Sequence, residues 1–165
     1  MSVTILLIPV ALAAASLAGG TGLAAAVRAR AEGRDSGDGG ATLSVRTRMK
    51  DRGLLGLALD DIGAVDVVVG DGRVTALVDD LRLSMTLTDD GVWEAHIDRE
   101  NGFDVDESAA TDLLGRIDAA YAGRVQSAVA ARIRAQADSA GFELVSETRD
   151  DEATVTMVLN VRNDA

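Results

Sequence analysis

Apolar and polar residues alternate along several short stretches of the chain, which is the pattern of a strand with one buried face. The Asp71–Gly72 pair between two of these stretches is typical of a tight hairpin, because glycine tolerates positive φ angles. The predicted strands are Leu43 to Met49, Val65 to Val69, Arg73 to Val78, Leu81 to Thr88, Val92 to Asp98, Phe142 to Thr148 and Thr154 to Val161.

A spacing of three or four residues between apolar positions predicts helices in two other regions. The first helix follows Asp51, which can cap it, and ends at Gly63. Because helices and antiparallel strands lie in separate runs, residues 41–165 read as one α+β domain. We expect an antiparallel sheet of about six to seven strands packed on two or three helices.

The second helical pattern runs from Glu107 to Ala140. Asp106 or Ser108 is its predicted N-cap, and Gly141 stands where a C-terminal cap is expected. Glycine weakens a helix interior, so Gly123 favours a break into a shorter and a longer helix.

An uncharged apolar run precedes the domain, from Val3 to Val27. A helix of this length can cross a hydrocarbon core of about 30 Å. Residues 1–27 are therefore interpreted as a transmembrane anchor that contacts lipid through residues 3–27, and residues 28–40, rich in charge and glycine, as a flexible linker. Arg28, Arg30 and Arg34 follow the run, so the positive-inside bias predicts a single-pass plasma-membrane protein with a cytoplasmic C-terminal domain.

Two further interpretations of the apolar run stay open. Small residues at Ala24 to Ala26 suit a signal peptidase, and cleavage there would release an exported domain. Small side chains also recur at four-residue spacing, which permits close packing of two membrane helices and hence a homodimer. This row consists of Ala14, Ala18, Gly22 and Ala26.

Composition narrows the classes of function. The formal charge of −11 argues against nucleic acid, whose phosphates require a basic face. The chain has no cysteine, so it forms no disulfide and has no thiolate chemistry, and a single histidine excludes histidine-rich metal sites.

Polar residues at strand and helix spacing give three candidate sites. Glu94, His96 and Asp98 alternate along one predicted strand and can present a metal or a substrate with one imidazole and two carboxylates. A second set resembles part of a calcium loop and consists of Asp104, Asp106 and Glu107. Four arginines on the long helix can dock an acidic partner, and these are Arg116, Arg124, Arg132 and Arg134.

Paired aspartates recur at the predicted ends of elements. Such pairs occur in hydrolases and calcium sites, but aspartate is also favoured at turns because its side chain bonds nearby backbone N–H groups. The pairs are Asp60–Asp61, Asp79–Asp80, Asp89–Asp90 and Asp150–Asp151. No phosphate-binding glycine motif and no nucleophile elbow is present. We therefore assign no catalytic, cofactor-binding or metal residue.

Three stretches resemble an uncharacterised family, the domain of unknown function twelve fifty-seven, which includes the hypothetical chloroplast reading frame thirty-five. They are VRTRMKDRGLLGLALDDIGA, GVWEAHIDRENGFDV and LLGRIDAAYAGRVQSAVAARIRAQADSAGFELVSE. The resemblance implies a fold and no established activity. The predicted function is a non-enzymatic protein-binding or adaptor domain with a protein partner; the alternatives are a metal-dependent or carboxylate-based enzyme and an exported soluble domain.

Overall fold

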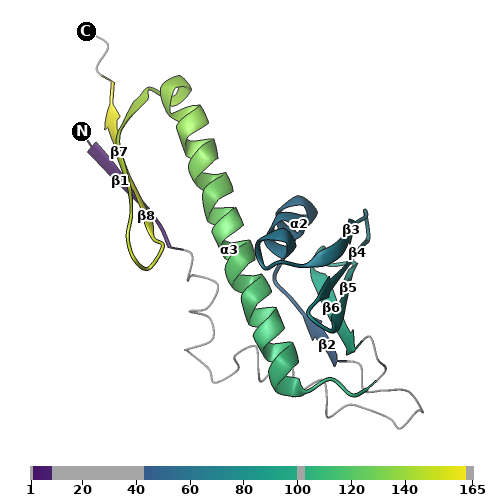
Figure 1. Cartoon of the computed structure of the whole chain (residues 1–165). Helices are drawn as coiled ribbons and strands as arrows, with labels where there is room; N and C mark the ends of the chain where they lie inside the picture. The colour runs from purple at the N-terminus through teal and green to yellow at the C-terminus, as the bar shows by residue number, and fades with distance from the viewer. Residues whose placement is uncertain (1, 9–42, 100–102, 163–165) are drawn as a thin grey trace. The chain divides into compact units, whose positions relative to one another are not determined.

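A computed structural model describes residues 2–8, 43–99 and 103–162. These residues form an α+β structure with two α-helices and two antiparallel sheets that together hold eight strands (Figure 1). The chain divides into two compact units. Unit 1 comprises Met1–Leu12 and Ala122–Ala165, and unit 2 comprises Ala13–Tyr121. The α+β class is confirmed, whereas the expectation of one sheet of six to seven strands was wrong, because the strands separate into two sheets.

Unit 2 contains the five-stranded sheet, in the order β2-β6-β5-β4-β3. Each strand from β3 to β6 pairs with the next in sequence, and β2 joins at the β6 edge. The strands are β2 (Leu43–Arg46), β3 (Val65–Val69), β4 (Arg73–Val78), β5 (Leu81–Leu87) and β6 (Trp93–Arg99). The sequence predicted all five, with β2 ending three residues earlier than expected.

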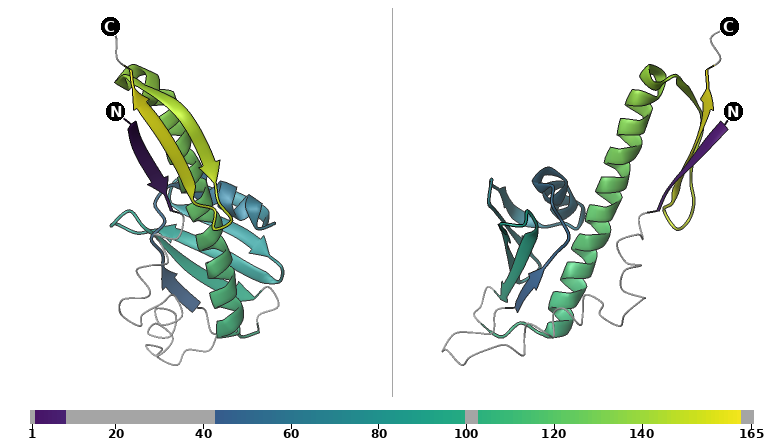
Figure 2. Two further views of the ribbon diagram at one scale, coloured as in Figure 1. Left: turned by 90° about the vertical axis from the view of Figure 1, so that its left-hand side faces the viewer. Right: turned by 180° about the vertical axis from the view of Figure 1, so that it is seen from behind.

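Helices cover one face of this sheet. Helix α2 (Arg52–Asp61) and the first turns of α3 (Glu107–Ala137) lie on the same side of it (Figure 2). The predicted cap is confirmed, since the Asp51 carboxylate accepts a hydrogen bond from the Leu54 backbone N–H at 2.9 Å. The buried core comprises Val45, Leu55, Ala58, Leu59, Val74, Ala76, Val78, Leu83, Met85, Trp93, Ala95, Ile97, Ala110, Leu113, Leu114 and Ile117.

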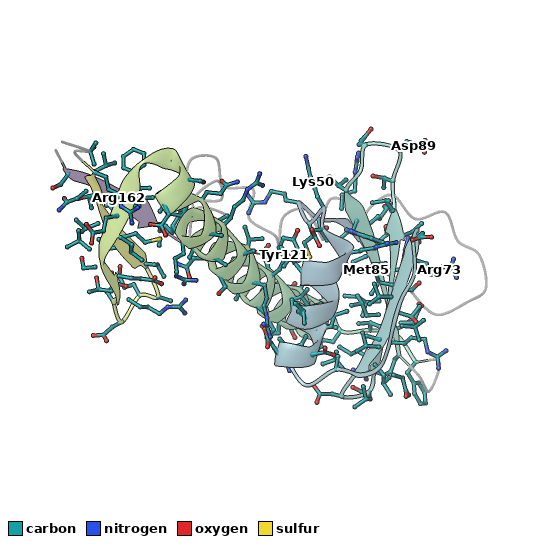
Figure 3. All side chains as sticks on the ribbon, turned by 90° about the horizontal axis from the view of Figure 1, so that it is seen from above. Lys50, Arg73, Met85, Asp89, Tyr121 and Arg162 are labelled. Carbon is teal, nitrogen blue, oxygen red and sulfur yellow. The ribbon has the colours of Figure 1, made fainter. Side chains whose placement is uncertain are left out.

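The buried Tyr121 ties α3 to the segment that precedes α2 (Figure 3). Its hydroxyl oxygen accepts hydrogen bonds from the backbone N–H groups of Lys50, at 3.1 Å, and Asp51, at 3.0 Å. The Trp93 indole N–H donates to the Lys50 carbonyl at 3.3 Å. One short segment is therefore held from both a helix and a strand.

Helix α3 is continuous from Glu107 to Ala137, so the expected break at Gly123 was wrong. A glycine in a helix interior costs about 1 kcal/mol, and buried side chains on both sides of Gly123 offset it. A short 3-10 turn, Asp138–Ala140, follows, and Gly141 caps it at a left-handed φ of 79°. The Gly141 cap was predicted from the sequence.

Unit 1 contains the three-stranded sheet, in the order β1-β8-β7. Its strands are β1 (Ser2–Leu7), β7 (Phe142–Arg149) and β8 (Val155–Val161). The predicted closing hairpin is confirmed as β7 and β8. Its core joins one face of the sheet to the second half of α3, and its members are Ala130, Ala137, Val155, Met157 and Leu159, with Ile5, Leu7, Ile133, Phe142 and Leu144 packed against them.

Strand β1 corrects the start of the predicted transmembrane helix. Val3 to Leu7 form a strand that pairs with β8 in an antiparallel register from Ser2↔Asn160 to Leu7↔Val155. Val3, Thr4 and Ile5 are β-branched and favour extended backbone. The uncharged apolar run gave no sign that β8 supplies a partner strand for these residues.

The remainder of the apolar run, the predicted linker at 28–40 and the row of small residues lie outside the described residues. Among the described helices, neither is long and apolar enough to cross a membrane.

Candidate functional site

The face of the five-stranded sheet that lies opposite α2 and α3 carries the candidate triad. Glu94, His96 and Asp98 project from the same face of β6, as predicted, and all three are half-buried. The groups opposite them on β2 and β5 are mostly hydroxyls and arginines. The opposed residues are Ser44 and Ser84 for His96, Arg46 and Thr86 for Glu94, and Arg82 for Asp98.

This arrangement brings Glu94, His96 and Asp98 together, and the residues opposite them on β2 and β5 are not histidines or carboxylates. The Ser44 hydroxyl donates to the Glu94 carboxylate at 2.8 Å. Within the described part of the chain, no group of three or more histidine or carboxylate side chains is placed to hold a metal ion. The face is therefore a polar surface in which serine, threonine and arginine neighbour the carboxylates and the imidazole.

A shallow hollow of about 240 Å³ lies at the end of this face, lined by Arg46, Thr88, Asp89, Asp90 and Glu94. Arg46 forms an ion pair with Asp90 across it. The Thr88 hydroxyl donates to the Val92 carbonyl at 2.9 Å, within the turn that joins β5 to β6. Arg46, Thr88 and Asp90 therefore bond to one another or within the turn.

The paired aspartates occupy turns and element ends, as expected from their preference for such positions. Asp79 pairs with Arg116 at 3.3 Å and Asp80 with Arg99 at 3.2 Å. The Asp150 carboxylate accepts backbone hydrogen bonds from two residues of its own turn, at 3.0 and 2.8 Å. The aspartates therefore either form ion pairs with arginines of other elements or hold the backbone of their own turn.

The partial calcium motif is a helix cap. The Asp106 carboxylate accepts hydrogen bonds from the Ser108 backbone N–H at 2.8 Å and from the Ser108 hydroxyl at 3.0 Å. These bonds hold the pKa of Asp106 below its ordinary value. Asp106, one of the two predicted N-caps, thus caps α3.

Two of the four arginines on α3 bond to groups of their own unit. Arg116 donates to the Ile62 carbonyl at 3.0 Å, in addition to its pair with Asp79. Arg134 donates to both carboxylate oxygens of Glu147, at 2.7 and 2.8 Å. This two-pronged contact lowers the pKa of Glu147 and raises that of Arg134. Arg116 and Arg134 therefore each form contacts within their own unit, and docking of an acidic partner by the four arginines stays a prediction.

Sequence reasoning missed an apolar surface on α2 and β3, which we call the α2–β3 surface. Leu57 on α2 and Val65, Val68 and Val69 on β3 are between 42% and 64% exposed. Val69 lies opposite the buried Val74, on the α2 side of the sheet, whereas Val65 and Val68 lie opposite Leu77 and Thr75 on the other side, so this surface wraps around the β3 edge. The two elements touch closely, because a Cβ at Gly56 would lie 3.0 Å from a Val69 methyl carbon. The run VDVVV was the available signal, since it holds more apolar residues than one buried face requires.

Comparisons with models of known protein families, with characterised proteins and with solved structures find no match for this chain. The resemblance to the domain of unknown function twelve fifty-seven family stays a prediction.

Proposed function

We propose that this chain is a protein-binding module whose partner docks on the α2–β3 surface. The observation that carries the proposal is the exposure of Leu57, Val65, Val68 and Val69 on two adjoining elements at one edge of a sheet. Apolar residues scattered singly over a surface are ordinary, whereas a group on adjoining elements marks an interaction site.

The charges beside this surface indicate the chemistry of the partner. Asp60 on α2 and Asp66 on β3 are exposed next to the apolar residues, and the chain as a whole carries a formal charge of −11. Complementary charge around an apolar centre speeds association and disfavours wrong partners. The proposed partner therefore presents apolar side chains flanked by lysine or arginine.

A photo-crosslinking amino acid at position 68 tests this proposal in the native cells. The matched control is the same amino acid at Val145, which is 55% exposed in the three-stranded sheet of unit 1. We expect one discrete adduct from position 68 and no such adduct from position 145. Adducts that are equal at both positions, or absent from position 68, would contradict the proposal.

A second variant distinguishes specific docking from chance contact. Leu57→Asp combined with Val65→Asp should abolish the adduct at position 68, because it places a charge on each of the two elements that form the apolar surface. Substitutions at exposed positions usually change stability by less than about 0.5 kcal/mol, and fluorescence of the buried Trp93 checks that unit 2 remains folded. An adduct that persists in the double variant refutes docking at this surface.

Membrane attachment of the module stays a prediction, supported by the uncharged run at 3–27 and the arginines that follow it. If the chain crossed a membrane once after β1, then β1 would lie on one side of the bilayer and β8 on the other. The anchored form and the β1–β8 pairing are therefore alternatives. Alkaline extraction of native membranes tests the attachment: release of the chain into the supernatant would contradict it.

A further inference from the structure

Two open sheets leave four edge strands, and these differ in how they are protected. An edge strand presents unpaired backbone N–H and C=O groups that can pair with another chain. Natural proteins commonly prevent such pairing with charged side chains, proline, bulges or very short strands. In the described part of the chain the edge strands are β2 and β3 of one sheet and β1 and β7 of the other.

Three of these edges carry a protective feature. Strand β2 has only four residues and ends in Arg46. Strand β3 has a register irregularity between Val65 and Val68, where Asp66 adopts a left-handed φ of 52°. Strand β7 has an irregularity between Leu144 and Ser146 and carries three charged side chains, Glu143, Glu147 and Arg149.

Strand β1 carries none of these features. Its sequence, SVTILL, holds no charge and no proline, and its six residues pair with β8 without a register shift. Leu6 is 61% exposed and Val3 45% exposed. A six-residue segment with high strand propensity and no charge readily pairs with another strand.

We propose that β1 pairs antiparallel with β1 of a second copy of this chain, which joins two three-stranded sheets into one six-stranded sheet. A strand that pairs with its own copy does so about a two-fold axis, so the assembly closes at two chains. The charged β7 edges then form the outer limits of the joined sheet and oppose further growth. The chain is strongly acidic, and β1 is an uncharged edge along which two copies can approach without repulsion.

The alternation of side chains limits the registers of this pair, and the register with Ile5 opposite its own copy meets the condition. Ile5 and Leu7 face the core of unit 1, and both copies must keep their apolar residues on one face. With Ile5 opposite Ile5 of the second copy, Val3 lies opposite Leu7 and Thr4 opposite Leu6. The exposed Leu6 side chain thereby gains a neighbour on the other face of the sheet.

Lysine substitutions on the two edges of the same sheet test the proposal. Thr4→Lys places a charge on β1, and Thr148→Lys places the same charge on β7; both threonines are exposed. Light scattering of the full chain should give the mass of a dimer for the unaltered chain and for Thr148→Lys, and half that mass for Thr4→Lys. A monomeric unaltered chain, or equal effects of the two substitutions, would overturn the proposal.

Cross-linking then locates the contact. The chain has no cysteine, so Thr4→Cys and Leu6→Cys chains can be mixed and treated with a short bismaleimide. We expect a cross-linked pair from this mixture and none when Thr148→Cys replaces Leu6→Cys. Absence of the first product overturns the register, and a β1 that cross-links only to a different protein overturns the choice of a second copy.

Discussion

Helix α3 carries one buried side chain in each unit that hydrogen-bonds to the backbone of other segments, Tyr121 in unit 2 and Gln126 in unit 1. We call these two side chains the clamps, and they bond to different kinds of segment. In unit 2 the Tyr121 hydroxyl accepts hydrogen bonds from two successive backbone N–H groups just before α2. In unit 1 the buried Gln126 amide donates to the Leu7 carbonyl at 2.7 Å and to the Ala153 carbonyl at 2.6 Å. Tyr121 thus orders one short segment, whereas Gln126 connects the first strand of the chain to the last hairpin.

The two sheets also differ in how far apart in the sequence their paired strands lie. Strands β3 to β6 of unit 2 pair with their neighbours in sequence, whereas β1 of unit 1 pairs with β8, as in the Ser2 to Asn160 contact across 158 positions. Closing a long loop costs more conformational entropy than closing a short one. Unit 2 should therefore form independently of the chain ends, and unit 1 should lose structure first.

Core truncations give the largest expected effect and test whether the units separate. Leu83 in unit 2 and Met157 in unit 1 are fully buried. Replacing either with alanine should cost about 2–5 kcal/mol. Trp93, the only tryptophan, lies in unit 2, so we expect Leu83→Ala to shift its fluorescence transition in urea. Met157→Ala should instead accelerate hydrogen exchange in β8. Equal shifts of the Trp93 transition would show one cooperative unit.

Substitution of the clamp residues Tyr121 and Gln126 should have the next largest effect on stability. Tyr121→Phe leaves two backbone N–H groups without their acceptor, and Gln126→Ala removes the donor to two carbonyls; each should cost about 1–3 kcal/mol. The Gln126 amide oxygen is buried and has no hydrogen-bond partner among the described residues, so its removal relieves part of the loss. We expect the larger destabilisation for Tyr121→Phe in urea denaturation, and the reverse order would contradict this account of the clamps.

Sequence reasoning succeeded where structure is encoded locally. The β3–β4 hairpin, the Asp51 cap and the alternation along β5 each act within a few residues, so they were visible without any knowledge of the fold. The positive φ angles expected for the Asp71–Gly72 pair were wrong, because neither residue adopts one. It failed for β1, because the partner of that strand lies at the far end of the chain. Alternation also does not say which strands share a sheet, so the division into two sheets was not predicted.

The candidate sites could also be predicted only where they depend on residues close together in the sequence. The Glu94, His96 and Asp98 face was predicted from spacing, but the serine and arginine neighbours that surround it come from other strands. The α2–β3 surface depends on contact between a helix and an edge strand, as at Gly56 and Val69. No single stretch of sequence contains that contact.

Local caps give a smaller expected effect. Asp51 caps α2 in unit 2, and Asp150 holds the β7–β8 turn in unit 1. Substitution of either by alanine should cost about 1 kcal/mol. We expect Asp51→Ala to shift the Trp93 transition and Asp150→Ala to leave it unchanged, as measured in parallel urea titrations. A Trp93 shift in Asp150→Ala would show that the β7–β8 turn is coupled to unit 2.

Acid sensitivity is the smallest expected difference. The Arg134 hydrogen bonds hold the pKa of Glu147 below its ordinary value. A carboxylate whose pKa is lower in the folded state stabilises it above the ordinary pKa and loses that contribution as the pH falls. Glu147→Gln should therefore flatten the acid dependence of unit 1, measured by hydrogen exchange in β8 from neutral to acid pH. An unchanged pH profile in Glu147→Gln would show that this pair does not contribute.

The position of β1 has a consequence for the synthesis of the chain. Its residues are translated well before those of β8, which ends at Val161. At about 5–20 residues per second, an uncharged apolar strand waits on the order of ten to thirty seconds for its partner. During that interval β1 is an apolar strand without its partner, so the rate of elongation sets how long these six residues are exposed before β8 can cover one edge of them.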